Sequence, residues 1–288
     1  MAGKRMPELN FRRMRVAFQG EPGAFSDAAA VELLGDGIRT VPRTTFDAAF
    51  QAIADGAADA LLVPVENTLA GSVVRVYDLL LESKLEMCGE TILPIEHQLM
   101  GMPGAKREEL KAVASHPMAL AQCERFFAGN PQLKRVPAED TAGSVREMME
   151  RGDKHFGSIA GKRAAGHYGA VILQENIQDN AENFTRFVLL LPPEHAKLYR
   201  GADAKKISLA MRLAHKPGAL LASLEPFANH GVNLLKIESR PIHGRPWEYQ
   251  FYLDVEAEEP EHLELALKEV GKATSELRVL GKYAAARR

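Results

Sequence analysis

Short apolar runs alternate with helix-like repeats along most of the chain, beginning near Val16. The run RVAFQG predicts a strand, and DAAAVELL predicts a helix with Ser26 as its N-cap and Gly35 at its end. IRTVPR and DALLVPVE predict two further strands with a helix between them, and Ser72 is the expected N-cap of the next helix. A second set of strands and helices runs from KAVASH to AVILQENIQDN. This rhythm is typical of α/β proteins, so the sequence predicts two α/β lobes, with NFTRFVLL crossing back to the first.

Breaks in this rhythm indicate the domain boundaries. The extended segment LEMCGETILPIEHQLMG is interrupted by Pro94, which suits a connection between two sheets. LPPEHAKLYRGADAKK carries charges and two prolines but no sustained apolar period, so it is the expected linker. We therefore expect lobe one at residues 14–92 plus 182–192, lobe two at 93–181, and the linker at 193–204.

Residues 205–284 form a third predicted unit, whose elements follow the order βαββαβ. This order is that of the ferredoxin-like α+β fold. Many functions use that fold, so the order alone identifies none. PGALL and IESRP mark the start of its first helix and the end of its second strand, where a Pro-Gly entry lets the backbone approach a small ligand.

Composition narrows the classes of partner. The chain has 288 residues, a formal charge of −2 and 46% hydrophobic residues, so it can bury several cores and has no basic field for nucleic acid or anionic lipid. Two cysteines, Cys88 and Cys123, are more typical of a reduced cytoplasmic protein than of a disulfide scaffold. No apolar run spans a membrane, and the basic start lacks the apolar core of a secretory signal. A short organelle-targeting segment is the alternative to a cytoplasmic location.

Two strand ends carry polar side chains suited to a ligand. GEPGAFS (residues 20–26) follows a strand and opens a helix, where backbone N–H groups bind anions, although a tight turn alone would use the same residues. PVENTLAGS (residues 64–72) ends a strand with Glu66 and Asn67. Ligands of α/β sheets bind beyond the carboxyl ends of strands, so both are candidates for a cleft. The alternative is that Asn67 and Thr68 only shape the turn.

A third strand end, SHPMALAQC, places Ser115 and His116 before a helix that begins at Pro117. Either residue could simply cap that helix. His97 and His116 have no Cys, Asp or Glu at ligand spacing, so we predict no metal.

NFTRFVLL places Asn183, Thr185 and Arg186 in front of an apolar run. In a regular strand Arg186 and Thr185 face opposite sides, so both cannot point into one cleft. Arg186 then either contacts a ligand or pairs with a carboxylate at the hinge.

Together these stretches resemble the prephenate dehydratase family. GEPGAFS, PVENTLAGS, SHP, IQDNAENFTRF, PGALL and NLLKIESRP occur in the family's order over nearly the whole chain. The resemblance implies a catalytic domain at 14–192 built like a periplasmic binding protein, with the site between its lobes. It also implies an ACT domain at 205–284 that binds phenylalanine as a feedback inhibitor, a dimer or tetramer, and no cofactor.

The resemblance also implies roles for individual residues. Thr185, Glu66 and Asn67 are the implied catalytic residues. Further substrate contacts are implied for Ser26, Thr68, Gly71, Ser72, Ser115, His116, Ser158, Asn183, Arg186 and Phe187. The implied phenylalanine site contains Gly218, Ala219, Leu220, Leu221, Asn233, Glu238, Ser239, Arg240 and Pro241.

One position departs from the family pattern. Met118 stands where the family usually has a glutamine that contributes to substrate binding, and a thioether lacks the donors of an amide. Gln122, one turn later on the same helix face, is the candidate replacement.

The implied reaction is the decarboxylating dehydration of prephenate to phenylpyruvate, in phenylalanine biosynthesis. We expect Thr185 to donate a hydrogen bond or relay a proton to the leaving hydroxyl, with protonated Glu66 behind it. Arogenate dehydratase, which shares the motifs, and a non-catalytic amino-acid sensor are the alternatives.

Overall fold

The computed structural model describes residues 13–199, 204–242 and 244–286. The chain divides into two compact units. The N-terminal unit contains the described residues up to Ser83 together with Thr91–Leu189, and the C-terminal unit contains Lys84–Glu90 and the chain from Leu190 onward. No helix in the described part of the chain is long and apolar enough to cross a membrane.

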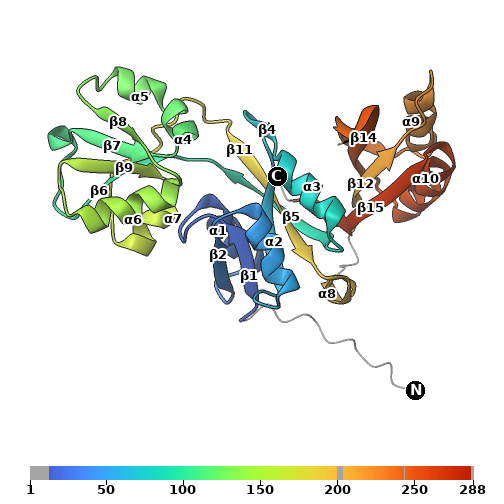
Figure 1. Ribbon diagram of the computed structural model, residues 1–288, viewed down its shortest axis with the longest axis horizontal. Helices are drawn as coiled ribbons and strands as arrows, with labels where there is room; N and C mark the ends of the chain where they lie inside the picture. Colours follow the sequence, from blue (N-terminus) through green and yellow to red (C-terminus); the bar gives the residue numbers. More distant parts are fainter. Residues whose placement is uncertain (1–12, 200–203, 243, 287–288) are drawn as a thin grey trace. The chain divides into compact units, whose positions relative to one another are not determined.

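The first lobe of the N-terminal unit is built on strands in the order β11-β3-β1-β2. Strand β1 pairs in parallel with both β2 and β3, and helices α1, α2 and α3 pack against these strands (Figure 1). Its buried centre explains the apolar runs of the sequence, since Val16, Phe18 and Leu61 are fully buried. The elements are β1 (Arg15–Gln19), α1 (Phe25–Leu34), β2 (Arg39–Arg43), α2 (Phe46–Ala54), β3 (Ala60–Asn67), β4 (Gly71–Ser72), α3 (Val74–Glu82) and β11 (Phe184–Leu191).

The second lobe has a five-stranded sheet in the order β10-β6-β9-β7-β8. Helices α6 and α7 cover one face over a core that contains Met148, whereas α4 and α5 cover the other over a core that contains Phe126 (Figure 1). The elements are β6 (Gln98–Gly101), η1 (Arg107–Glu109), β7 (Ala112–Ser115), α4 (Pro117–Ala121), α5 (Glu124–Ala128), β8 (Lys134–Pro137), α6 (Thr141–Arg151), β9 (Phe156–Ala160), α7 (Lys162–Tyr168) and β10 (Val171–Gln174).

The C-terminal unit contains the predicted βαββαβ order, in a sheet arranged β13-β14-β12-β15. Strand β12 is antiparallel to both of its neighbours, β14 and β15. The segment expected as a linker contains helix α8 (Pro193–Tyr199), and residues 200–203 lie outside the described residues. The other elements are β12 (Lys206–Arg212), α9 (Ala219–Asn229), β13 (Asn233–Ile242), β14 (Arg245–Glu256), α10 (Pro260–Ala273) and β15 (Glu276–Tyr283).

Strand β5 (Glu86–Pro94) belongs to both units. Its residues up to Glu90 lie in the C-terminal unit, and its residues from Thr91 lie in the N-terminal unit. The sequence predicted a break at Pro94. Strand β5 ends at this residue, and the next strand, β6, begins at Gln98.

Two expected helix caps were wrong. Helix α1 begins at Phe25 with Ala24 as N-cap, so Ser26 lies inside the first turn. The carboxylate of Asp27 instead reaches back and accepts the backbone N–H of Gly23 at 3.0 Å. Ser72 lies in strand β4, and α3 begins after Val73. The N-cap residues of the two helices, Ala24 and Val73, make no side-chain capping hydrogen bond, so neither helix has the expected serine cap.

Candidate active site

Asn67 joins the end of β3 to the start of β11. Its Oδ1 accepts the backbone N–H groups of Leu69 and Ala70 at 2.9 and 2.8 Å. Its Nδ2 donates to Asn183 Oδ1 at 2.7 Å and to Thr185 Oγ1 at 2.9 Å. Because two N–H donors fix which end of the amide is oxygen, the other end must be the NH₂ group. The Thr185 oxygen is therefore an acceptor here, and its own hydrogen remains available to donate.

Thr68 fastens the same turn to the chain in front of β11. Its hydroxyl accepts the backbone N–H of Phe184 and donates to the carbonyl of Glu182, both at 2.9 Å. A hydroxyl is one donor and an acceptor, so both functions are used within the protein. Both of these contacts of Thr68 are long-range, whereas the turn after β3 is shaped by Asn67, whose Oδ1 accepts from Leu69 and Ala70.

Glu66 and Arg186 form a second pair between the same two strands. Arg186 Nη2 lies 3.4 Å from Glu66 Oε2, with the arginine side chain 10% exposed and the carboxylate side chain 40% exposed. Successive side chains of a strand face opposite sides, in β3 as in β11. The Asn67–Thr185 pair and the Glu66–Arg186 pair therefore occupy opposite faces. The expected placement of Glu66 behind Thr185 does not fit this arrangement, whereas the expected pairing of Arg186 with a carboxylate does.

Asn183 is the most enclosed polar residue of this group, at 1% exposure. Its Oδ1 accepts from Asn67 and its backbone carbonyl accepts the N–H of Ile95 at 2.7 Å. Its Nδ2 is buried and has no hydrogen-bond partner among the described residues. A buried amide donor without a partner is costly, so this group is suited to an oxygen supplied from outside the protein.

The candidate residues of the second lobe have local partners. Ser115 Oγ donates to the carbonyl of Ile159 at 2.6 Å, and the hydroxyl of Ser158 is hydrogen-bonded to that of Ser144. Ser115 and Ser158 are both fully buried. His116 is the N-cap of α4, where its Nδ1 accepts the N–H of Met118 at 3.2 Å. These contacts support the lobe itself. Phe187, also expected at the site, is a core residue at 2% exposure.

Gln122 was the expected replacement for the amide missing at Met118. Met118 is 51% exposed, whereas the Gln122 Oε1 atom lies 2.8 Å from Nε2 of His97. The side-chain carbonyl of Gln122 is thus engaged by the histidine. Burial lowers the pKa of His97, so the neutral ring is favoured.

His97 should make stability depend on pH. Its pKa is lower in the folded protein than in the unfolded chain, so below about pH 6.5 the unfolded chain binds the additional proton. The free energy of unfolding should therefore fall as the pH drops from 7.5 to 5.5, by at most about 1.4 kcal/mol per pH unit from this group. Urea titrations of wild type and His97→Gln test this. Equal pH slopes in the two proteins would contradict it.

The GEPGAFS turn contacts the second lobe closely. A Cβ at Gly23, whose φ is +86°, would lie 2.7 Å from the Cα of Ala164. Asp27, at 1% exposure, accepts from Arg163 Nε at 2.6 Å. Asp27 and Arg163 were not predicted, and an acidic residue in the first turn of α1 was the one signal for them. The turn thus joins the lobes, and Ser26 lies buried at this junction.

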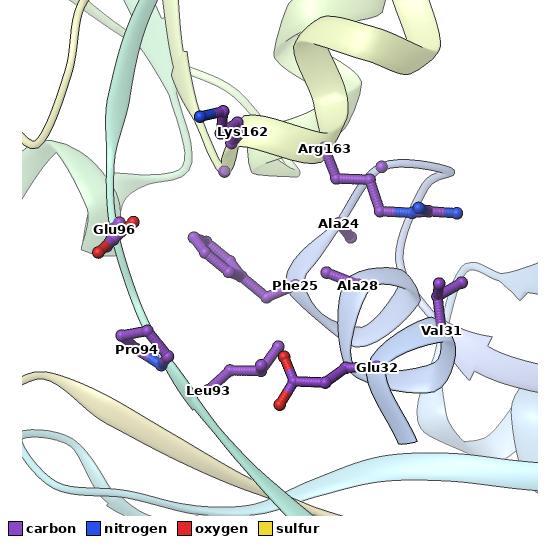
Figure 2. A pocket seen from close by; sticks show the side chains of 12 residues that line it. Ala24, Phe25, Ala28, Val31, Glu32, Leu93, Pro94, Glu96, Lys162 and Arg163 are labelled. Atoms are coloured by element: carbon purple, nitrogen blue, oxygen red, sulfur yellow. The ribbon is translucent and has the colours of Figure 1, made fainter. Parts of the chain in front are cut away.

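A pocket of about 480 Å³ lies beside this junction (Figure 2). Phe25 projects from the start of α1 toward the Leu93–Glu96 segment, as Figure 2 shows. Pockets of this size accept small molecules. Thr185 and Asn67 do not line it. Its lining residues are Gly23, Ala24, Phe25, Ala28, Val31, Glu32, Leu93, Pro94, Glu96, Gly161, Lys162 and Arg163.

The expected phenylalanine residues lie in the C-terminal unit. Ala219 and Leu220, in the first turn of α9, line a pocket of about 160 Å³ together with Trp247. Gly218 is the N-cap of α9, and Leu221 is 72% exposed. Asn233 begins β13, and the stretch from Glu238 to Pro241 pairs with β14. Nη1 of Arg240 is buried without a hydrogen-bond partner in the described structure.

Cys88 and Cys123 are both buried thiols that are not joined in a disulfide, and burial raises the pKa of Cys123 to about 12. Among the residues that the structure describes, no group of three or more His, Cys, Asp or Glu side chains is placed to hold a metal ion.

Comparison with known proteins shows the family of this chain. The family model for prephenate dehydratase matches residues 16–195, which contain every residue of the Asn67–Thr185 group. The chain belongs to the prephenate dehydratase family. Members of this family are hydro-lyases. Arogenate dehydratase/prephenate dehydratase 1, chloroplastic, of Arabidopsis thaliana is 39% identical, over 94% of this chain and 72% of its own length.

Solved structures support the same placement. A prephenate dehydratase from Arthrobacter aurescens, in complex with L-Phe, aligns with a TM-score of 0.82 and 30% identity, covering 94% of this chain and 90% of its own. A protein described as GqqA, a novel type of quorum quenching acylases, aligns with a TM-score of 0.83 and 33% identity over 94% and 98% of the two chains. The prephenate dehydratase fold of this chain thus extends through its C-terminal unit.

Proposed function

We propose that this chain converts prephenate to phenylpyruvate, CO₂ and water. In this reaction the bond to the ring carboxylate breaks and its electron pair enters the ring. The ring C–O bond breaks as this electron pair moves, and the leaving hydroxide takes up one proton from the solvent to become water. Aromatisation supplies the driving force, so no cofactor is required. The protein needs only to hold the dianion and to stabilise the leaving oxygen.

The orientation of the Thr185 hydroxyl is the observation that carries this proposal. Asn67 Nδ2 occupies the acceptor side of that hydroxyl at 2.9 Å, which leaves its hydrogen to donate to the leaving oxygen. Asn183 Nδ2, buried without a partner in the described residues, is suited to hold a second oxygen of the substrate. We assign Glu66 the role of holding Arg186, with which it pairs at 3.4 Å.

Arogenate is the second candidate substrate. The similar plant enzymes carry arogenate dehydratase in their names, and arogenate differs from prephenate by an amino group in place of the side-chain keto group. A non-catalytic amino-acid sensor and an acylase like GqqA are the further alternatives.

Phenylalanine is the proposed regulator. The unpartnered Arg240 Nη1 is suited to a carboxylate, and the apolar pocket at the start of α9 is suited to a ring. The exposed apolar residues Leu221, Leu235 and Ile237 of the same unit support a homo-oligomer, because such surfaces are usually covered by a partner. The two buried thiols, which are not joined in a disulfide, support a cytoplasmic location.

A substrate competition tests the reaction. The purified protein is incubated with prephenate and arogenate together, and phenylpyruvate and phenylalanine are quantified. Phenylpyruvate formation from prephenate alone is then measured with and without added L-phenylalanine. We expect phenylpyruvate as the main product and a lower rate with phenylalanine. Phenylalanine as the main product would assign arogenate dehydratase instead. Formation of neither product would overturn the proposal.

A further inference from the structure

Part of strand β5 is docked tightly within the C-terminal unit. Gly281 of β15 pairs in parallel with Met87 of β5. A Cβ at position 281 would lie 2.0 Å from the carbonyl oxygen of Met87, so only glycine permits this approach. Gly89 of β5 also lies against the ring of Tyr199, whose hydroxyl would be 3.2 Å from a Cβ at position 89. The first half of β5 therefore has little freedom to move independently of this unit.

The same half-strand ends in a buried ion pair. Nζ of Lys206 lies 2.9 and 2.8 Å from the two carboxylate oxygens of Glu90, with side-chain exposures of 8% and 2%. The backbone N–H of Ala286 also donates to Glu90 Oε1 at 2.9 Å. The Lys206 ammonium lies 5.8 Å from the ring centroid of Tyr283, whose hydroxyl is 2.6 Å from Ser208 Oγ. Burying two charges costs desolvation free energy, which can cancel their attraction. We therefore regard this ion pair as a contact that fixes the position of β5, and not as a large contribution to the free energy of unfolding.

The other half of β5 leads to the candidate active site. Thr91 follows Glu90 directly, and its hydroxyl donates to Glu32 of α1 at 3.0 Å. Four residues later, the N–H of Ile95 donates to the carbonyl of Asn183 at 2.7 Å. Asn183 is held by Asn67, which also positions the Thr185 hydroxyl. A shift of β5 along its length would therefore alter the hydrogen bonds that orient Thr185.

We infer that Glu90 and Lys206 are a positioning pair, through which the C-terminal unit sets the position of β5 and thereby the Asn183–Asn67–Thr185 hydrogen bonds. This inference rests on the proposed function, because its effect is read as control of the dehydratase by phenylalanine. Ligand binding to the C-terminal unit shifts the Lys206 ammonium relative to the Glu90 carboxylate. This displaces β5 and therefore Ile95, which follows it. The coupling is measured as the effect of phenylalanine on the rate with and without the pair.

Removing both charges of the pair tests the inference. The double variant Glu90→Gln with Lys206→Met avoids an unpaired buried charge, and glutamine keeps an acceptor for Ala286 N–H. The matched control is Lys205→Met with Glu258→Gln, the same changes in a neighbouring exposed pair 3.3 Å apart. Trp247, the only tryptophan of the chain, lines the pocket of the C-terminal unit, so we expect its fluorescence to change when phenylalanine binds there.

Three measurements are made on each full-length protein: the rate with prephenate alone, the rate at saturating L-phenylalanine, and the Trp247 titration. In the double variant we expect a retained fluorescence change, and the rate at saturating L-phenylalanine is expressed relative to the same protein's rate without it. The fold inhibition should shrink at least about five-fold, which is the lower end of typical coupling. The control should be inhibited like wild type.

Wild-type inhibition in the double variant would overturn the inference, and so would a loss of the fluorescence change together with the inhibition. A wild-type enzyme that consumes prephenate but does not respond to phenylalanine would also overturn it, while leaving the proposed reaction intact. Failure to consume prephenate or arogenate would instead reject the proposed function.

Discussion

Thr185→Val is expected to lower kcat by about 100- to 1,000-fold with little change in KM, which is the typical effect of removing one donor to a developing oxyanion. Valine keeps the shape of the side chain, which is 8% exposed, and removes only the hydroxyl. The donor matters because charge develops on the leaving oxygen as the C–O bond breaks, whereas the bound substrate carries a neutral hydroxyl there. Initial rates with prephenate over a range of concentrations measure both parameters.

Thr185→Ser is the matched control. Serine keeps the hydroxyl and the acceptor that Asn67 Nδ2 requires, so most of the activity should return. If valine and serine were equally active, or if KM alone changed, the assignment of Thr185 to the leaving oxygen would be wrong.

Asn67→Asp should lower kcat by about 10- to 100-fold while the protein stays folded, because it removes a positioning contact that acts through Thr185. Aspartate keeps the oxygen that accepts from Leu69 and Ala70, so the turn after β3 remains capped. It replaces the NH₂ group by an acceptor that faces Thr185 Oγ1 and Asn183 Oδ1. The Thr185 hydroxyl then donates its hydrogen bond to the new carboxylate and no longer donates to the substrate.

The pH dependence distinguishes this effect from simple damage to the fold. Protonation of the new carboxylate restores a donor at that position, so the activity of Asn67→Asp should recover in part as the pH falls through the range where that group titrates. Thermal unfolding of wild type and variant monitors the fold in parallel. A variant with wild-type kcat, or one that loses activity equally at every pH, would contradict the role given to Asn67.

Local patterns were sufficient to predict most elements of this fold. Apolar runs predicted β1, β3, β9 and β11, because residues such as Val16 and Leu189 are buried where the pattern requires an interior. The order βαββαβ of the C-terminal unit was also predicted and is present. The placement of Glu66 and Asn67 at a strand end followed from the same reasoning, because a parallel sheet presents its carboxyl ends to a ligand.

The features that the sequence did not predict depend on contacts between residues far apart in the chain. The helix expected to begin at Pro117 does so, but it ends at Ala121 as α4. A second helix, α5, begins at Glu124, because the carboxylate of Asp179 accepts the N–H groups of Glu124 and Arg125. Glu66 lies 120 positions before Arg186, its partner. No local period encodes such pairs, so the opposite faces of Thr185 and Arg186 were predictable, but the partner of each was not.

The division of β5 between the two units bears on any attempt to obtain the catalytic part alone. Cutting the chain after residue 204 would remove β12 and β15, which supply Lys206 to Glu90 and Gly281 to Met87. The remaining protein would present a bare strand edge with a buried-type carboxylate at its end, and unpaired edges promote association between chains. Precipitation of the shortened protein would therefore say little about inhibition. A soluble fragment is more readily obtained if Glu90 is also replaced and charged side chains are added along β5.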